Sequence, residues 1–165
     1  MEITNSQNFV DYYSKIKRRT RRLFDIIPKE QIEWTYRPDK FTFGDLIRHM
    51  ALIERYMFAE NVQLKPSKYR GCDITYAEGK ENVVKLYDKL WIESKNIFLD
   101  LSTNDLKKKC ITPADVEITV WKWLRAMVEH EIHHRGQIYL YLNLLEINTP
   151  PLYGLTSEEV GSKSI

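Results

Sequence analysis

Residues 120–145, VWKWLRAMVEHEIHHRGQIYLYLNLL, carry apolar side chains at steps of three and four along their whole length. That spacing is typical of a helix with one buried face. Pro150 and Pro151 follow the stretch and prevent the helix from continuing. The buried face comprises Trp123, Met127, His130, His134, Ile138, Tyr141 and Leu145. The stretch therefore predicts a long helix whose apolar face is interrupted by two histidines.

Three further segments, residues 7–27, 43–63 and 76–101, show the same helical spacing. The apolar faces comprise Phe9, Tyr13, Ile16, Thr20, Leu23 and Ile27 in the first; Leu46, His49, Ile53, Tyr56 and Glu60 in the second; and Val83, Tyr87, Leu90, Ser94, Ile97 and Leu101 in the third. Four helices that each bury one face predict an all-α protein, a four-helix bundle. We expect residues 1–165 to form one domain, which is a sufficient length for a proper core.

The connections between these helices differ in length and character. Pro66, Gly71 and polar residues form a long crossover after the second helix. Before the last helix, two β-prone pieces, residues 109–112 and 116–120, flank Pro113-Ala114-Asp115 and predict a small hairpin. After the last helix, the tail is expected to contain one short helical turn near Ser157.

Composition and charge exclude several classes of protein. Hydrophobic residues are 43% and charged residues 29%, which is typical of a globular chain, and the net charge of +2 is too small to indicate a polyanion-binding protein. Residues 1–8 are polar and do not resemble a signal peptide, and no apolar run is long enough to cross a bilayer. Cys72 and Cys110 belong to no CxxC pair, so we expect free thiols in a cytoplasmic protein rather than a disulfide or a metal thiolate.

Three histidines lie on apolar helix faces. His130 and His134 are four residues apart and stack on one side of their helix, and His49 lies between Leu46 and Ile53 on another. Three imidazoles in one core each need a partner, and a divalent metal ion satisfies all three because neutral imidazole binds zinc, nickel, copper or iron. Three protein ligands leave an open coordination position, as in catalytic sites. The alternative is that each is a hydrogen-bonded core histidine.

The same stretch contains a second metal motif. Residues 130–134, HEIHH, match H-E-x-x-H, in which Glu131 would serve as the general base of a zinc protease. Such a protease needs a third ligand, for which the downstream candidates are Glu146, Glu158 and Glu159. It also needs a substrate-binding sheet, for which this chain is too helical and too short. His133 points about 60° away from His130 and is expected at the surface or beside the site rather than as a ligand.

Three segments, in order, resemble one known family. Residues 129–138, EHEIHHRGQI, resemble the HxxxHRGQ helix of the DinB-like family of metalloenzymes. Residues 43–50, FGDLIRHM, are similar to that family's second-helix segment, where a single histidine supplies the remaining ligand, and residues 149–154, TPPLYG, are similar to the loop after its last helix. The first match is fairly specific; the other two are weak alone.

The resemblance implies a four-helix bundle in a variant up-and-down order, often a homodimer, with a three-histidine divalent metal site. Carried over by position, the ligands are His49, His130 and His134, and zinc or nickel is the ion we expect. Characterised relatives include transferases in which the metal lowers the pKa of a small-molecule thiol that attacks an electrophile. A thiol-dependent transferase is therefore one hypothesis, a non-enzymatic metal-binding or interaction module a second, and a metal-dependent hydrolase a third.

Several charged and aromatic residues have two interpretations each. Glu129 and Glu131 could accept hydrogen bonds from ligand imidazoles or form a solvated helix flank. Arg135 could reach an anion but is expected to form an ion pair, and Gly136 is expected to let a neighbouring helix approach closely. Trp121 and Trp123 could line an entrance to the metal or pack in the core. A basic face on the first helix, formed by Lys15, Arg18, Arg19 and Arg22, could contact phosphates, but a solvated face is the simpler interpretation, so nucleic acid is not the expected partner.

Overall fold

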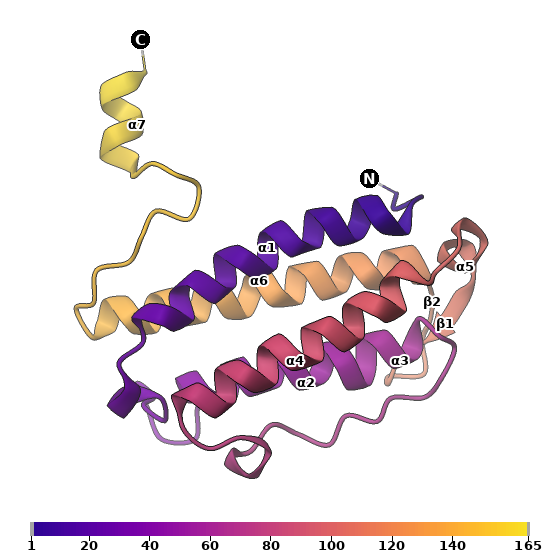
Figure 1. Cartoon of the computed structure of the whole chain (residues 1–165), viewed down its shortest axis with the longest axis horizontal. Coiled ribbons are helices and arrows are strands. Elements are labelled where there is room, and N and C mark those ends of the chain that lie inside the picture. Colours follow the sequence, from indigo (N-terminus) through magenta and orange to yellow (C-terminus); the bar gives the residue numbers. More distant parts are fainter. Residues whose placement is uncertain (1, 165) are drawn as a thin grey trace.

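Four long helices pack side by side in the computed structural model, which describes residues 2–164 (Figure 1). They are α1 (Ser6–Ile26), the segment α2–η2–α3, α4 (Lys80–Leu99) and α6 (Val120–Leu144). The second of these is continuous but not regular, because α2 (Phe43–Ile53) passes into a π-helical turn, η2 (Glu54–Phe58), before α3 (Ala59–Asn61). The expected all-α four-helix bundle is confirmed, and the π-turn is a feature that the sequence spacing did not indicate.

Short elements connect and extend the bundle. Single turns η1 (Lys29–Gln31) and η3 (Ile74–Tyr76) lie in the first and second connections, and α5 (Thr103–Lys107) follows α4. The expected hairpin is present as strands β1 (Lys109–Ile111) and β2 (Glu117–Thr119), paired antiparallel with Cys110 opposite Ile118. The helical turn near Ser157 is α7 (Ser157–Lys163), which projects away from the bundle (Figure 1).

The helix ends are set by local sequence signals. Thr42 and Asp45 form the expected capping box, in which each side chain accepts a hydrogen bond from the other's backbone N–H, so α2 begins at Phe43. The third bundle helix begins at Lys80 rather than at residue 76 as expected. Gly79 precedes it with a φ of 78°, a left-handed conformation that a helix cannot continue through, so residues 74–76 form only a separate turn.

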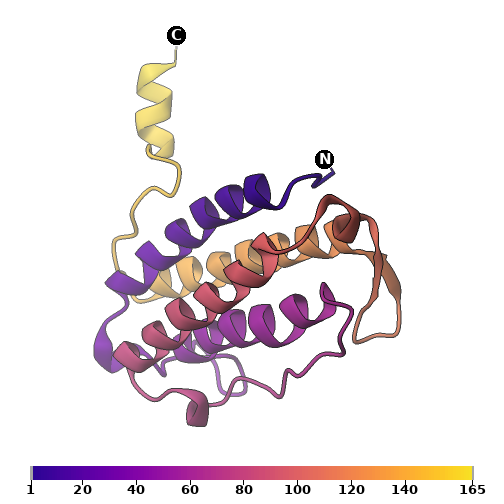
Figure 2. The same ribbon diagram turned by 45° about the vertical axis from the view of Figure 1, so that its right-hand side comes forward.

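The order of helix directions is not a simple alternation. Figures 1 and 2 show α1 and α6 running in one direction and α2 and α4 running in the other. Each helix packs against one parallel and one antiparallel neighbour: α1 against α6 and α4, and α2 against α4 and α6. Because α2 and α4 are parallel, residues 62–79 must return along the whole length of the bundle before α4 begins. The expected long crossover is this segment.

The core consists of two apolar clusters with a polar layer between them. One cluster gathers around Phe24, Phe43 and Tyr87, and the other around Phe9, Phe58 and Phe98. Each bundle helix contributes at least one buried polar residue between the clusters along its length. Among these residues are Lys17, Glu54, Ser94 and Glu131, each at most 4% exposed. Lys17 belongs to the basic stretch of the sequence, yet it lies inside the bundle.

Other expectations from the sequence have mixed outcomes. Cys72 and Cys110 are both free and buried, as expected. Within residues 2–164, no helix combines the length and the apolarity needed to cross a bilayer. Gly136 does not meet a neighbouring helix: it is exposed, and a Cβ added there would find no atom within 4 Å in the described part of the chain. That expectation is therefore wrong for the single chain.

Gly136 gives a first test. We expect Gly136→Ala to raise the free energy of unfolding by about 1 kcal/mol, because glycine is a poor helix former and the added methyl group has space. Gly44→Ala is the matched control: its Cβ would lie 2.6 Å from Glu33 Oε1 and 2.9 Å from Arg48 Nη1, so it should destabilise. Both are measured by urea denaturation. A loss of stability in Gly136→Ala, with a change in molecular mass, would instead place this face against a second copy, in the homodimer that the family resemblance implies.

Candidate metal centre

Three histidines from two helices meet between α2 and α6. The Nε2 atom of His130 lies 3.0 Å from Nε2 of His49 and 3.0 Å from Nε2 of His134. His130 and His134 lie one turn apart on α6, and His49 faces them from α2, which is antiparallel to α6. Metal–nitrogen bonds of about 2.0–2.1 Å at right or tetrahedral angles separate neighbouring ligand atoms by about 3 Å. Two of the three separations therefore match ligands of one shared ion, and the three histidines offer ligand atoms that all lie within 4.8 Å of one another.

The outward ring nitrogens hold two of the imidazoles in place. Nδ1 of His134 lies 2.6 Å from Gln137 Oε1, and Nδ1 of His49 lies 2.7 Å from the Tyr69 hydroxyl. An amide oxygen only accepts, so Nδ1 of His134 carries the proton and Nε2 presents a lone pair towards its neighbours. A hydroxyl at Nδ1 of His49 can accept the equivalent hydrogen bond. These contacts are the kind that orient metal-binding histidines.

The environment keeps the imidazoles uncharged. Burial, followed by the charge of the neighbouring His134, lowers the pKa of His49 to about 4. Burial, followed by the charges of His134 and His49, lowers the pKa of His130 to about 3. The pKa of His134 is also lowered, mainly by burial. All three rings are thus neutral at pH 7, which is the form that binds metal.

Aromatic rings enclose the centre on several sides. Phe41 lies 5.3 Å from the His49 ring and Phe58 lies 5.9 Å from the His130 ring, measured between centroids. Trp123 packs on Phe58 at 4.6 Å, so it is one ring removed from the histidines and belongs to the packing around them. These apolar walls limit the access of water to the three nitrogens.

Arg48 ties the crossover to α2 beside His49. Its side chain is fully buried and forms two parallel hydrogen bonds of 2.8 Å with the Glu33 carboxylate and one of 2.7 Å with Asp45. It also donates to the backbone oxygens of Cys72 and Ala77 in the crossover, at 3.0 and 2.9 Å. These bonds fix the path of residues 65–79 and with it the place of Tyr69. The contact of Tyr69 could not be predicted from the sequence, because a crossover has no periodicity that would indicate which side chains it brings together.

The carboxylates beside the histidines have other roles than expected. Glu131 accepts a hydrogen bond of 2.5 Å from the Tyr87 hydroxyl and lies 3.7 Å from Lys17 Nζ, while Glu129 is exposed and lies 3.8 Å from Arg125. The partners of the imidazoles are Tyr69 and Gln137 instead. With Glu131 engaged in the core, it is not placed as a general base. Of the two interpretations open for these glutamates, the solvated helix flank holds for Glu129, whereas Glu131 is buried and fits neither.

The zinc-protease alternative also fails on the third ligand. His130 and His134 meet His49, and the downstream candidates are all exposed and lie outside this cluster; they are Glu146, Glu158 and Glu159. His133 is exposed, with its ring 4.9 Å from that of His134, and also lies outside the cluster. The three residues that the sequence nominated are the ones that the fold brings together.

Arg135 differs from expectation as well. Among residues 2–164 it has no carboxylate within 4 Å, although the residue is only 4% exposed. The expected ion pair is therefore absent from the described part of the chain.

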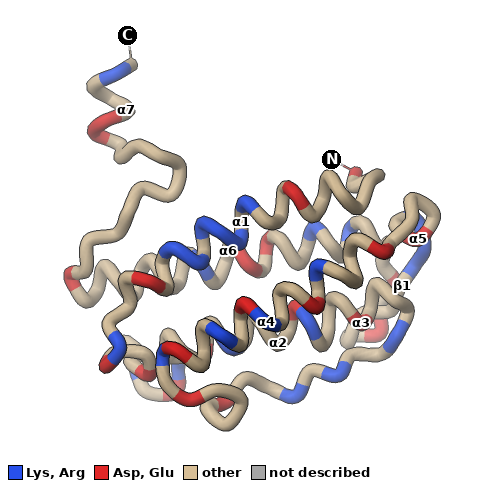
Figure 3. Tube along the Cα trace, in the orientation of Figure 1, with Lys and Arg blue, Asp and Glu red and all other residues tan. Residues whose placement is uncertain are grey.

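The basic face of α1 is exposed at Lys15, Arg18 and Arg22. Figure 3 shows this concentration of Lys and Arg along the helix.

Comparison with known proteins gives a family and several structures of the same fold. Residues 12–138 match the DinB superfamily. A DinB-like protein of Bacillus cereus superposes with a TM-score of 0.73 at 15% identity, covering 88% of this chain and 95% of that one. The DinB-like protein YjoA of Bacillus subtilis gives 0.72 at 18% identity, covering 89% and 97%.

A third structure carries a description of activity. YfiT of Bacillus subtilis, described as a probable metal-dependent hydrolase with an unusual four-helix bundle topology, gives a TM-score of 0.68 at 14% identity and covers 87% of this chain and 89% of that one. At these identities the likeness concerns the fold. The search of curated proteins finds no significant match. Because the superfamily match spans more than half of its residues, this chain belongs to the DinB superfamily.

Proposed function

We propose that the chain binds one divalent metal ion through His49, His130 and His134 and is a metal-dependent enzyme. The observation that supports this is the convergence of three neutral Nε2 atoms, two of them 3.0 Å from the third, with outward nitrogens held by Tyr69 and Gln137. Three protein ligands leave at least one coordination position for a reactant. We expect zinc or nickel, since three imidazoles suit both ions.

The residues around the centre have separable tasks. Gln137 keeps the proton of His134 on Nδ1, which directs the Nε2 lone pair inward. Tyr69 holds the His49 ring, and Phe41 and Phe58 keep the surroundings apolar. A bound divalent ion lowers the pKa of a thiol or water molecule and so supplies an anionic nucleophile at neutral pH.

The concrete reaction that we propose is transfer of a small-molecule thiol to an electrophile. It is supported by the resemblance of residues 129–138 to a family that contains thiol-dependent transferases. A metal-dependent hydrolase is the second candidate, favoured by the description of YfiT. For hydrolysis the chain offers no general base at Glu131, which is bonded to Tyr87. A non-enzymatic metal-binding module, the second hypothesis from the sequence, is now placed third.

Metal analysis tests the site. We expect about one zinc or nickel ion per chain in the purified protein, and loss of that ion in His49→Ala and in His134→Ala, because two imidazoles hold an ion far less tightly than three. His133→Ala is the matched control and should keep the metal, since His133 lies outside the cluster. Retention in both ligand variants, or no uptake by the wild type after reconstitution, would reduce the three histidines to core residues.

Reaction assays then separate the hypotheses. Metal-dependent consumption of a thiol with a generic electrophile, lost in His134→Ala, would support the transferase. Metal-dependent cleavage of model esters or amides without a thiol would support the hydrolase. If no reactant turns over but removal of the metal lowers thermal stability sharply, the binding module is the better description.

A further inference from the structure

Arg135 is a buried cation with unused hydrogen-bonding capacity. Its side chain is 4% exposed, and Nη1 is buried with no acceptor. Glu131, one turn earlier on α6, is where a helix would normally supply an ion-pair partner, but Glu131 is bonded to Tyr87. The one hydrogen bond of the Arg135 side chain among residues 2–164 runs from Nη2 to the Tyr153 hydroxyl at 3.3 Å.

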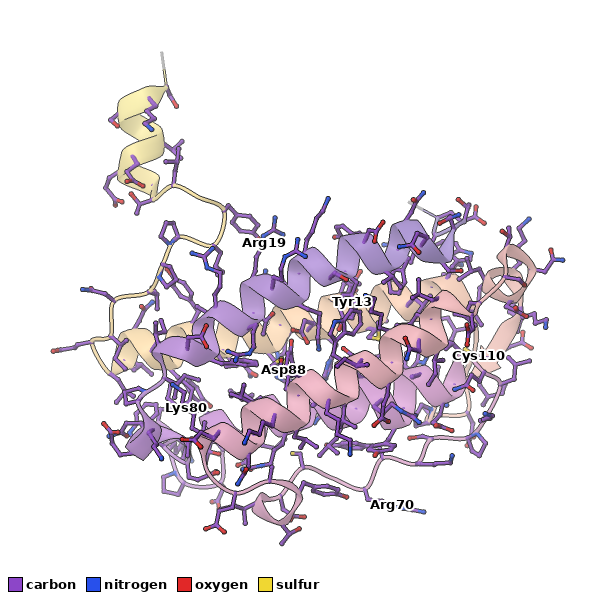
Figure 4. All side chains as sticks on the ribbon, in the orientation of Figure 1. Tyr13, Arg19, Arg70, Lys80, Asp88 and Cys110 are labelled. Carbon is purple, nitrogen blue, oxygen red and sulfur yellow. The ribbon has the colours of Figure 1, made fainter. Side chains whose placement is uncertain are left out.

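A second arginine and the tail complete the surroundings of Arg135. The Arg19 guanidinium lies 5.1 Å from the centre of the Tyr153 ring, so Tyr153 lies within reach of two guanidinium groups. Figure 4 shows Arg19 on the side of α1 that faces the tail. Like Arg135, Arg19 has no carboxylate within 4 Å in the described part of the chain. Tyr153 itself is 75% exposed, so moving it uncovers little apolar surface.

A neutral hydroxyl is a poor partner for a buried guanidinium. A buried charge without an anion is costly, and guanidinium binds carboxylate and phosphate through two parallel N–H donors. The Tyr153 hydroxyl provides one long hydrogen bond and leaves Nη1 unpaired. An oxyanion between Arg135 and Arg19 would satisfy the unpaired donor and offset both charges.

We propose that Arg135 and Arg19 form a binding site for an oxyanion group, carboxylate or phosphate, of a small molecule, and that Tyr153 is the side chain it displaces. Successive helix residues point about 100° apart, so Arg135 faces α1 whereas His134 faces His49 on α2. The site thus lies on a different side of α6 from the metal centre. It does not depend on the proposed function.

The same observations favour a small ligand over a nucleic acid. The buried donor is a single guanidinium between two helices. An isolated oxyanion can reach such a position more readily than the continuous sugar-phosphate backbone of a nucleic acid. The exposed Lys15, Arg18 and Arg22 lie on the same helix as Arg19, but Arg21 is neutralised by Asp88 and Asp25, and the whole chain carries only +2. Nucleic-acid binding needs many distributed phosphate contacts.

Calorimetric titration of the full chain tests the site, with inorganic phosphate and malonate as separate probes at low ionic strength. We expect saturable binding of at least one of them, weakened about tenfold or more in Arg135→Gln through loss of the paired donors. Arg19→Gln, at a less buried position, should weaken binding by a smaller factor. Tyr153→Phe should strengthen it, because a competing acceptor is removed. Binding of phosphate but not malonate would identify the oxyanion as a phosphate group. Binding of malonate but not phosphate would identify it as a carboxylate.

Controls separate this site from general charge effects. Arg70→Gln removes the same charge from the exposed crossover (Figure 4) and should bind both probes as the wild type does. Unchanged helical circular dichroism in Arg135→Gln would show that the bundle is intact. Equal affinities in wild type and Arg135→Gln, or no binding of either probe, would overturn the proposal. So would binding of a DNA oligonucleotide without phosphate binding, or a change in oligomeric mass in Arg135→Gln, which would assign the guanidinium to a carboxylate of a second copy.

Discussion

Replacing Lys17 with Met is expected to lower the free energy of unfolding by about 3–5 kcal/mol, because it leaves two buried carboxylates without their cation. Lys17 Nζ lies 2.9 Å from Glu54 Oε2, 3.7 Å from Glu131 Oε2 and 3.6 Å above the Tyr87 ring, and its side chain is 4% exposed. Tyr13 donates a hydrogen bond to the same Glu54 oxygen at 2.7 Å. Urea denaturation measures the loss.

The loss should depend on pH in a defined direction. Burial raises the pKa of Glu54, and the charge of Lys17 lowers it, so removing Lys17 raises this pKa further. A carboxyl whose folded pKa is raised contributes stability at low pH and loses it as pH rises through that pKa. The deficit of Lys17→Met should therefore be smaller at pH 5.5 than at pH 7.5.

Two further variants complete the comparison. Adding Glu54→Gln to Lys17→Met should recover part of the stability, because it removes one of the uncompensated charges. Lys15→Met, at an exposed position on the same helix, should change the free energy of unfolding by less than about 0.5 kcal/mol. An equal loss at both pH values together with no recovery in the double variant would contradict the charge explanation and leave packing as the cause.

The metal-free protein is expected to lose about 2–4 kcal/mol of stability between pH 7.5 and pH 5. Folding lowers the pKa of His49 to about 4 and that of His130 to about 3, from 6.5 in the unfolded chain. Below pH 6.5 these two histidines therefore bind protons in the unfolded chain but not in the folded state. The histidines' contribution is complete above pH 6.5 and is lost as pH falls towards 4.

Denaturation of the metal-free wild type and of two variants between pH 7.5 and pH 5 tests whether stability falls as the pH is lowered. His130→Phe should flatten the pH dependence, and the comparison with wild type cancels other titrating groups, including Glu54. The exposed His133 is the matched control, so His133→Asn should leave the slope as it is. A wild-type protein equally stable at pH 7.5 and pH 5 would mean that the three rings are not buried neutral imidazoles.

The helices and the three histidines could be predicted from the periodicity of apolar residues in the sequence, because this periodicity indicates which face of a helix is buried. All six residues of the expected stripe on α1 are buried, and His49, His130 and His134 were nominated because they interrupt such stripes. Periodicity says little about polar residues inside the core. Lys17 stands four residues after Tyr13 and three before Thr20, at the spacing of the buried face, but its charge and its basic neighbours favoured a solvated position.

What the sequence did not predict depends on tertiary contacts. The π-turn at residues 54–58 interrupts the regular α-helix, but the spacing of apolar residues in the sequence shows no corresponding break. Tyr69 reaches His49 through a crossover whose path is set by Arg48, twenty-one residues earlier in the chain. The lack of an ion pair at Arg135 could not be predicted either. Glu131 stands at the right spacing for one, but it accepts a hydrogen bond from Tyr87 instead.

The crossover has a consequence for how such metal centres diverge. The bundle helices carry both the proposed metal ligands and the apolar core, so a substitution there tends to alter folding and the histidine cluster together. Tyr69 contacts His49 from residues 65–73, which contain neither helix nor strand. Changes in this one connection can alter the basicity of the His49 imidazole while the core stays the same. Evolution can thus retune a proposed metal ligand without redesigning the scaffold that holds it.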